Sequence, residues 1–310
     1  MDYTIYIIGL AYLLGDLFLD EKKIDTTEPM KGKICLITGA NSGIGKATAL
    51  GLSKLGASLV FACRDRSRAE EAILEIKEKT GNDSIDLILA DLSSQKEIYK
   101  LVAEFKSRYD SLDVLINNAG VNLHKQIITE DGIENTFAVN YLAQFMLSNL
   151  LFDVLKKGNP GRIINVASSV QAKSIDFDDL KSDNHYRQMK AYAQSKLAVV
   201  LFTYEFARKI KDSGVTVNCL HPGYVKTNMI RKFRPFVKYF YHFIGLFMST
   251  PRKGAKTSIY LASSPEIDGT SGKYFKSRKE AKSVKVSYDK DVAKKLWDLS
   301  VKLTKVDFKN

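Results

Sequence analysis

The sequence predicts one α/β domain built on a doubly wound parallel sheet with helices on both faces, preceded by an apolar N-terminal helix. Two observations predict the sheet. Short apolar runs alternate with helical periodicity from residue 31 onward, and a glycine-rich turn follows the first run. A third observation concerns size, because a chain of 310 residues, 45% of them hydrophobic, is long enough to bury a large core.

Composition excludes several classes of protein. With 26% charged residues, the chain is neither disordered nor collagen-like, nor is it a small disulfide scaffold. Its three cysteines, Cys35, Cys63 and Cys219, lie in apolar runs without a Cys-x-x-Cys pair. This pattern indicates buried thiols in a reducing compartment rather than disulfides or a zinc site.

The net charge of +12 favours an anionic partner, which includes nucleic acid, anionic lipid and phosphorylated ligands. Much of the excess lies in residues 271–310, which hold 12 Lys or Arg against 5 Asp or Glu. This tail lacks the aromatic-interleaved groove of a single-strand binder, so nucleic acid is not an expected partner.

An apolar segment opens the chain. Residues 3–19 are interrupted only by Thr4 and Asp16, and as a helix they reach ~26 Å, just short of a ~30 Å hydrocarbon core. Asp2 replaces the basic start of a secretory signal, so we do not expect cleavage. Four lysines follow and favour a cytoplasmic domain: Lys22, Lys23, Lys31 and Lys33.

We therefore expect residues 1–30 to form a membrane-associating segment and linker. The alternative is an apolar helix that packs on its own domain or on a second subunit. The main domain is predicted over residues 31–276, with a substrate lid at about 224–250 and a basic C-terminal extension at 277–310. Its predicted strands cover residues 33–38, 58–62, 85–90, 113–117, 162–167 and 215–220.

The first strand runs into the turn 38–45 (TGANSGIG), and a helix follows. Glycines in this turn let the backbone approach a pyrophosphate, whose charge the helix N-terminus stabilises. A turn that merely packs is the alternative, but the strand before and the helix after favour a nucleotide site. The predicted contacts are Gly39, Ser42, Gly43, Ile44 and Gly45.

Four ordered motifs resemble the short-chain dehydrogenase/reductase family. They are Gly-x-x-x-Gly-x-Gly from Gly39, Asn117-Asn118-Ala119-Gly120, Tyr192-Ala193-Gln194-Ser195-Lys196 and His221-Pro222-Gly223. The likeness covers roughly residues 31–275 and implies a Rossmann-type fold, a nicotinamide dinucleotide and hydride transfer between a carbonyl and an alcohol. It also implies cofactor contacts at Asp91, Leu92, Asn118, Gly120, Tyr192, Lys196, Pro222, Gly223 and Thr227.

The end of the second strand favours NADP(H) over NAD(H). Members of the family that prefer NAD carry a carboxylate there, which holds the ribose hydroxyls and repels a 2′-phosphate. Here Cys63 is followed by Arg64, whose guanidinium suits a phosphate. Asp65 could instead tie up Arg64. Arg66 and Arg68 are expected on a solvated helix face.

Tyr192 and Lys196 are the predicted acid–base pair. A phenol with a pKa near 10 is a weak acid–base group at neutral pH unless a cation stabilises its anion. Lys196 follows at i+4, so a helix places both side chains on one face. Its ammonium and the charge of the oxidised nicotinamide would together lower the pKa of the phenol.

Two further catalytic residues follow from the resemblance. Ser168, aligned through the stretch Asn165 to Ser168, resembles the serine that positions the substrate oxygen, and Ser169 stays an open alternative by one residue. Asn140 resembles the helix asparagine that holds a water behind Lys196. Its alternative role is a hydrogen bond to local backbone.

Three features resemble the retinol dehydrogenase branch. Ser168 and Tyr192 are 24 positions apart, which is longer than usual for the family, residues 229–250 are dense in aromatic and basic side chains, and residues 254–262 and 269–275 match that branch. A membrane-facing lid that admits a lipophilic, retinal-like aldehyde, ketone or alcohol is the expectation, and simple core packing of these aromatics is the alternative.

Other sites are not expected. No HExxH motif and no histidine pair at i, i+4 occurs, so we predict no metal and place the four histidines on the surface or in loops: His124, His185, His221 and His242. A Gly-x-Ser-x-Gly elbow is also absent, which excludes that class of hydrolase. The alternatives that remain are a non-catalytic nucleotide-binding interaction protein of the same fold and an NAD-dependent steroid or lipid alcohol dehydrogenase.

One helix predicts a possible homodimer. Between Ala191 and Ile210, apolar residues lie on more than one face, which exceeds a single core-facing stripe. A subunit interface would bury this surplus, which comprises Leu197, Val199, Val200, Leu201 and Phe202.

Overall fold

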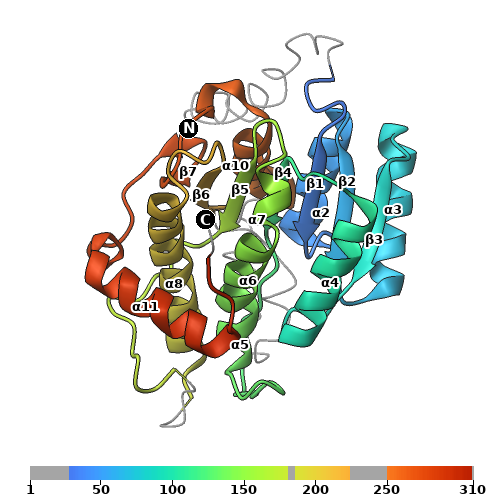
Figure 1. Cartoon of the computed structure of the whole chain (residues 1–310). Coiled ribbons are helices and arrows are strands. Elements are labelled where there is room, and N and C mark those ends of the chain that lie inside the picture. The colour runs from blue at the N-terminus through green and yellow to red at the C-terminus, as the bar shows by residue number, and fades with distance from the viewer. Residues whose placement is uncertain (1–27, 181–185, 224–249, 309–310) are drawn as a thin grey trace, which may run out of the picture.

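The computed structural model describes residues 28–180, 186–223 and 250–308. Within these ranges the chain forms one eight-stranded sheet in the order β3-β2-β1-β4-β5-β6-β7-β8 (Figure 1). Its strands are β1 (Ile34–Thr38), β2 (Ser58–Cys63), β3 (Ile85–Leu89), β4 (Val114–Asn117), β5 (Arg162–Val166), β6 (Thr216–His221), β7 (Tyr274–Lys276) and β8 (Lys279–Glu280). The predicted parallel α/β sheet is confirmed, and β8 alone pairs antiparallel in it.

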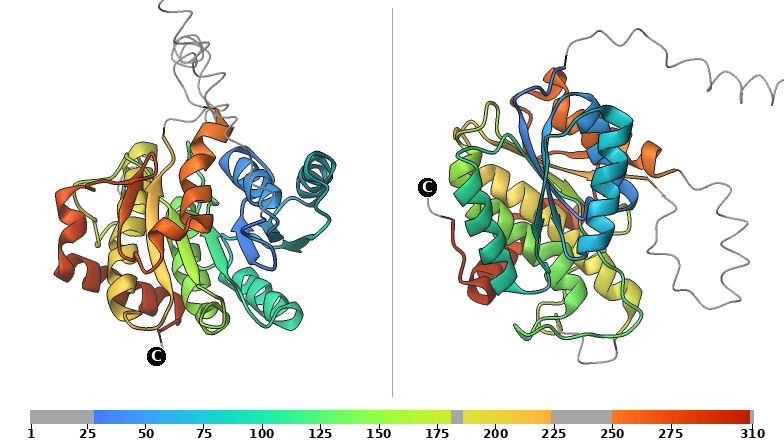
Figure 2. Two further views of the ribbon diagram at one scale, coloured as in Figure 1. Left: turned by 90° about the horizontal axis from the view of Figure 1, so that it is seen from above. Right: turned by 90° about the vertical axis from the view of Figure 1, so that its right-hand side faces the viewer.

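Helices cover both faces of the sheet, as the two views in Figure 2 show. On one face lie α2 (Gly43–Lys54), α3 (Arg66–Thr80) and α10 (Pro251–Ser263). The other face carries α4 (Gln95–Arg108), α5 (Asn135–Phe137), the π-helix η1 (Ala138–Leu142), α6 (Ala143–Leu150), α7 (Phe152–Leu155) and α8 (Gln188–Lys209). The C-terminal part adds η3 (Pro265–Ile267), η4 (Lys285–Tyr288) and α11 (Lys290–Thr304).

The central strands are apolar without alternation because both of their faces are covered. In β1, Cys35, Leu36 and Ile37 are completely buried. The strand order reverses at β1, which pairs with β2 on one side and with β4 on the other. Connections diverge at this point, so a crevice opens beyond the carboxyl ends of the strands, where α/β proteins place their ligands.

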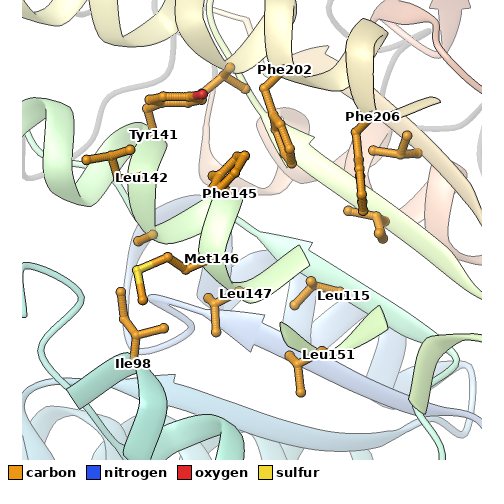
Figure 3. Packing of buried hydrophobic residues seen from close by; sticks show 14 of the residues in the cluster. Ile98, Leu115, Tyr141, Leu142, Phe145, Met146, Leu147, Leu151, Phe202 and Phe206 are labelled. Atoms are coloured by element: carbon orange, nitrogen blue, oxygen red, sulfur yellow. The ribbon is translucent and has the colours of Figure 1, made fainter. Parts of the chain in front are cut away.

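Aromatic side chains of η1, α6 and α8 lie close together in the core (Figure 3). Trp297 of α11 packs against them. Phe145 and Trp297 have ring centroids 5.0 Å apart in an edge-on contact, and Phe202 and Phe206 stack at 5.2 Å. The hydroxyl group of Tyr141 hydrogen-bonds that of Ser300 on α11 at 2.6 Å. The buried phenol therefore has a hydrogen-bond partner.

Helix α11 corrects the predicted reason for a homodimer. The five apolar residues of α8 that were assigned to a subunit interface are no more than 2% exposed within the single chain. Trp297 and the rest of the apolar face of α11, together with η1, cover this surplus. The assignment of these residues to an interface was wrong because residues 277–310 were interpreted as a basic extension, whereas they contain the amphipathic helix α11. The homodimer itself stays a prediction.

The segment after residue 276 is therefore part of the domain. Ala293, Leu296, Trp297 and Val306 belong to the same core cluster as α6 and α8. Its basic residues point outward, and they include Lys294, Lys295, Lys302 and Lys305, all of them exposed.

Two predicted membrane features lie outside the described residues: the apolar N-terminal segment and nearly all of the lid. In the ranges that are described, no helix combines the length and the apolar character needed to cross a bilayer.

Candidate active site

A cleft of about 510 Å³ lies beyond the carboxyl ends of the strands. Its walls come from the turn after β1, from the ends of β2, β3, β4 and β5, and from α8. The predicted site residues that line it are Gly39, Ser42, Gly43, Ile44, Gly45, Arg64, Asp91, Leu92, Asn118, Gly120, Tyr192, Lys196 and Pro222. Asn140, Ser168 and Gly223 lie outside this lining, and Thr227 lies outside the described residues.

The glycine turn needs its glycines for two different reasons. Gly39 and Gly43 have φ angles of 65° and 55°, in the left-handed region that favours glycine. At Gly45, a Cβ atom would lie 2.3 Å from the carbonyl oxygen of Gly39 and 2.5 Å from Nδ2 of Asn118. Any side chain at position 45 would therefore push the turn apart.

Asn118 and Thr38 join the turn to the end of β4. Nδ2 of Asn118 donates to the carbonyl oxygen of Thr38 at 2.9 Å. The hydroxyl of Thr38 accepts from the backbone N–H groups of Asn118 and Ala119, each at 2.9 Å. Sequence reasoning missed the role of Thr38, although its place directly before the glycine turn is a usable signal.

The start of α2 fits a pyrophosphate. Ser42 is the N-cap residue, and its side chain makes no capping hydrogen bond to the first amides of the helix. Those amides are the groups that bind phosphate at helix N-termini. Together with the tight turn that the glycines at 39, 43 and 45 allow, this geometry matches a dinucleotide, and these residues would hold its phosphates.

At the ribose end of the cleft, Arg64 pairs with Asp91 at 3.1 Å, with side chains 74% and 35% exposed. Asp65 does not tie up Arg64, because it caps α3 by accepting from the N–H of Arg68 at 3.1 Å. Although burial raises it, the pKa of Asp91 lies below its usual range because Ser93 and Arg64 hydrogen-bond the carboxylate.

Arg66 and Arg68 are both exposed on α3, as predicted. Arg68 also lines the cleft beside Arg64, whereas Arg66 pairs with Glu70 and does not line the cleft. Burial raises the pKa of Cys63 to about 11, so the position of the family's carboxylate carries a neutral thiol.

The catalytic end is built on α8. Nζ of Lys196 lies 5.8 Å from the ring centre of Tyr192 and donates to the carbonyl oxygen of Val166 at 2.9 Å. Burial lowers the pKa of Lys196 to about 8. Burial also raises the pKa of Tyr192, while a hydrogen bond with Ser168 lowers it. Both shifts follow from moving these groups out of water.

The structure brings Ser168, not Ser169, to Tyr192. Ser168 is 7% exposed and hydrogen-bonds the phenol, whereas Ser169 is exposed. The alignment through Asn165 thus selects the residue with the suitable position, and its catalytic role stays a prediction.

Asn140 lies in η1, behind the wall of the cleft, and is fully buried. Its Nδ2 donates to the carbonyl oxygen of Val121 at 2.9 Å and to Oγ of Ser195 at 3.0 Å. Both amide hydrogens are therefore used by protein groups. A Cβ atom at Gly120 would lie 3.3 Å from Oδ1 of Asn140 and 3.6 Å from Nζ of Lys196, so this glycine packs directly against both residues.

His221 corrects another prediction, because it is 3% exposed rather than a surface residue. It is the last residue of β6, and its Nδ1 accepts from the N–H of Ser169 at 3.1 Å. Burial, with a smaller effect of Lys276, lowers its pKa to about 4. Among the described residues, no group of three or more His, Cys, Asp or Glu is arranged to hold a metal ion.

Sequence reasoning also missed part of the cleft lining, for which the loops after β1 and β4 supply most of the residues. They are Asn41, Val121, Asn122, Leu123, Asn135 and Val139. Their only signal is their closeness to the motifs, because loop positions carry no periodicity.

Comparison with known proteins decides the family. Residues 33–238 match the model of the short chain dehydrogenases. The chain belongs to the short-chain dehydrogenase family. It is an oxidoreductase whose relatives include retinol dehydrogenases. Human retinol dehydrogenase 14 is 43% identical over 288 residues, which cover 87% of this chain and 86% of that protein. Human retinol dehydrogenase 13 is 40% identical, covering 96% and 92% of the two chains.

A further relative is human polyprenol dehydrogenase, 38% identical over 97% of this chain and 95% of its own length. Among solved structures, an uncharacterised protein from Mycobacterium paratuberculosis superposes with a TM-score of 0.71 at 28% identity, covering 91% and 96% of the two chains. A short-chain dehydrogenase from Burkholderia cenocepacia in complex with NADP has a TM-score of 0.64 at 26% identity, covering 80% and 96%.

Proposed function

We propose that this dehydrogenase uses NADP(H) to interconvert a lipophilic, retinal-like aldehyde or ketone and its alcohol. The observation that carries the proposal is the meeting of Tyr192, Lys196 and Ser168 at one end of a glycine-lined cleft. The names of the relatives support the substrate class, since they include retinol and polyprenol dehydrogenases.

The side chains supply the proton chemistry. A bound nicotinamide supplies or accepts the hydride. Ser168 donates a hydrogen bond to the substrate oxygen and orients the carbonyl, while Tyr192 gives its proton to that oxygen in reduction and takes it back in oxidation. Lys196, with a pKa of about 8, is mainly protonated at neutral pH, and its charge stabilises the phenolate that forms.

The preference for NADP(H) is supported at the ribose end. Two guanidinium groups, Arg64 and Arg68, line the cleft, and Cys63 places a neutral thiol where a carboxylate would repel a 2′-phosphate. The ion pair between Arg64 and Asp91 is exposed, so it exchanges for a phosphate at little cost, ~0–1 kcal/mol.

Turnover with a panel of carbonyls tests this function. Purified full-length protein is given NADPH or NADH with retinal, a long-chain aldehyde or a short aldehyde. We expect kcat/KM for retinal to exceed that for the short aldehyde by ~100-fold, because the longer apolar body is buried in the site. NADPH should be the better cofactor. Tight NADPH binding without turnover on any carbonyl would favour a non-catalytic protein.

Membrane attachment through residues 1–30, with the domain on the cytoplasmic side, belongs to the same proposal. It is supported by the apolar character of residues 3–19 and the lysines that follow. Deleting residues 2–19 should move the protein from the membrane pellet to the supernatant. Unchanged partitioning would contradict attachment by this segment.

A further inference from the structure

The backbone that carries Ser168 is held from several sides. The carbonyl oxygen of Ser168 accepts a hydrogen bond from the hydroxyl of Tyr274 at 3.1 Å and another from Nε2 of Gln171 at 2.8 Å. The next amide, that of Ser169, donates to Nδ1 of His221 at 3.1 Å. The serine hydroxyl itself accepts from the N–H of Val170 at 3.0 Å.

Two of these partners come from neighbouring strands. His221 ends β6, which pairs in parallel register with β5, Val166 lying opposite Leu220. Tyr274 opens β7, where it lies opposite Cys219 of β6. The turn after β5 is therefore contacted by both side chains. They approach it from β6 and β7, which lie on the opposite side of β5 from β1 and its glycine turn.

Both side chains are buried, His221 at 3% and Tyr274 at 4% exposure. Burying a polar group without a partner costs ~1–3 kcal/mol, so an apolar residue would fill either position more cheaply if packing were the only requirement. Because the ring of His221 is neutral near pH 7, its Nδ1 keeps the lone pair that accepts from Ser169.

We propose that His221 and Tyr274 are positioning residues that hold the Ser168–Ser169 backbone so that the hydroxyl of Ser168 faces Tyr192. This inference rests on the proposed function. Neither residue lines the cleft, so they act through Ser168 rather than on substrate or cofactor. Displacement of a positioned group by about 1 Å is enough to lower a rate ~100-fold.

Substitutions at His221 separate the role of Nδ1 from that of size. In His221→Asn, the amide oxygen takes the place of Nδ1 and keeps an acceptor for the N–H of Ser169. In His221→Gln, the oxygen lies near the place of Nε2 instead. We expect His221→Asn to keep kcat within about threefold of wild type and His221→Gln to lower it ~10-fold or more, with the KM for NADPH unchanged in both.

Tyr274→Phe provides a second variant that keeps the ring and removes the hydroxyl. It should lower kcat ~10-fold without changing the KM for NADPH. Tyr260→Phe is the matched control, since the Tyr260 hydroxyl donates to Glu266 of η3 at 3.0 Å and Tyr260 does not line the cleft. This control should leave kcat unchanged.

Amide hydrogen exchange at Ser169 gives a readout that does not depend on turnover. Its N–H should stay protected in wild type and in His221→Asn, and exchange faster in His221→Gln. Equal kcat in the Asn and Gln variants, or equal exchange, overturns the inference about His221, and wild-type kcat in Tyr274→Phe overturns it for Tyr274. A wild-type protein without turnover would contradict the proposed function, while the exchange data would still decide the inference.

Discussion

The two ends of the cleft are built in different ways. At the catalytic end, Lys196 is 3% and Ser168 is 7% exposed, and both are hydrogen-bonded to protein groups. At the ribose end, the side chain of Arg64 is 74% exposed and that of its partner Asp91 is 35% exposed. The groups at the catalytic end are buried, whereas the charges at the ribose end are exposed to solvent.

This difference determines how each end responds to change. Buried charges interact in a low dielectric and are little affected by salt, but each of them shifts its pKa on burial. Exposed charges are screened over ~8–10 Å at ordinary ionic strength and contribute little to stability. Substitutions at the catalytic end should therefore change kcat, and those at the ribose end should change cofactor affinity in a salt-dependent way.

Lys196→Met should have the largest effect. Without the ammonium, the phenolate of Tyr192 loses its nearby cation, and kcat should fall ~1000-fold with a smaller change in NADPH binding. Steady-state kinetics and cofactor fluorescence measure the two quantities. Lys190→Met is the control, because Lys190 lies on the same helix, is exposed and pairs with Asp176. If Lys196→Met kept a tenth of the wild-type kcat, the result would contradict the stabilisation of the phenolate by Lys196.

The same lysine makes stability depend on pH. Its folded pKa of about 8 lies below the ordinary lysine value of 10.5, so the unfolded chain binds more protons between these values. Through this window the free energy of unfolding of wild type should rise with pH, relative to Lys196→Met, by up to about 3 kcal/mol. Denaturant unfolding at pH 7.5 and about pH 10 measures it. If the free energies of unfolding of wild type and Lys196→Met changed with pH in the same way, burial would not lower the pKa of Lys196.

Gly45→Ala tests the glycine turn between the two ends. The added Cβ would lie 2.3 Å from the carbonyl oxygen of Gly39, so the turn must open. NADPH should bind ~100-fold more weakly, since phosphate binding depends on this backbone. Gly81→Asn is the control, because Gly81 has a positive φ of 67° and open space around it. If Gly45→Ala bound NADPH as tightly as wild type, the glycine turn would not be part of the cofactor site.

Arg64→Ala should have the smallest effect. The KM for NADPH should rise ~10-fold while that for NADH stays unchanged, and the difference should shrink in high salt. Arg68→Ala should act in the same direction, because Arg68 also lines the cleft. Arg66→Ala is the control, since Arg66 pairs with Glu70 away from the cleft. If the KM for NADH rose as much as the KM for NADPH, Arg64 would not bind the 2′-phosphate.

Local sequence signals predicted much of the fold and site. All six predicted strands occur within about a residue of their expected bounds, because apolar runs between glycine-rich turns are local features. The glycine turn and the spacing from Tyr192 to Lys196 were predictable for the same reason. Both depend only on backbone geometry over a few residues.

What failed depends on contacts between distant segments. The surplus apolar face of α8 found its partner in α11, about 90 residues further along the chain. His221 was assigned to the surface because a histidine carries no local sign of burial. The solvated face of α3 was predicted correctly for Arg68, but its place beside the cleft depends on how α3 packs and was not predicted. In each case the outcome depends on which segment packs over the residue. The spacing of residues in the sequence does not determine this packing.

The role of Tyr192 as proton donor can be tested in the first turnover of Tyr192→Phe. Enzyme loaded with NADPH is mixed with excess retinal, and the loss of NADPH absorbance is followed in wild type and variant, after equal NADPH affinity has been established by fluorescence titration. The account predicts that the variant binds NADPH normally and that its first turnover is slowed ~1000-fold. An equal rate of first turnover in the two proteins would contradict the role of Tyr192 as the proton donor.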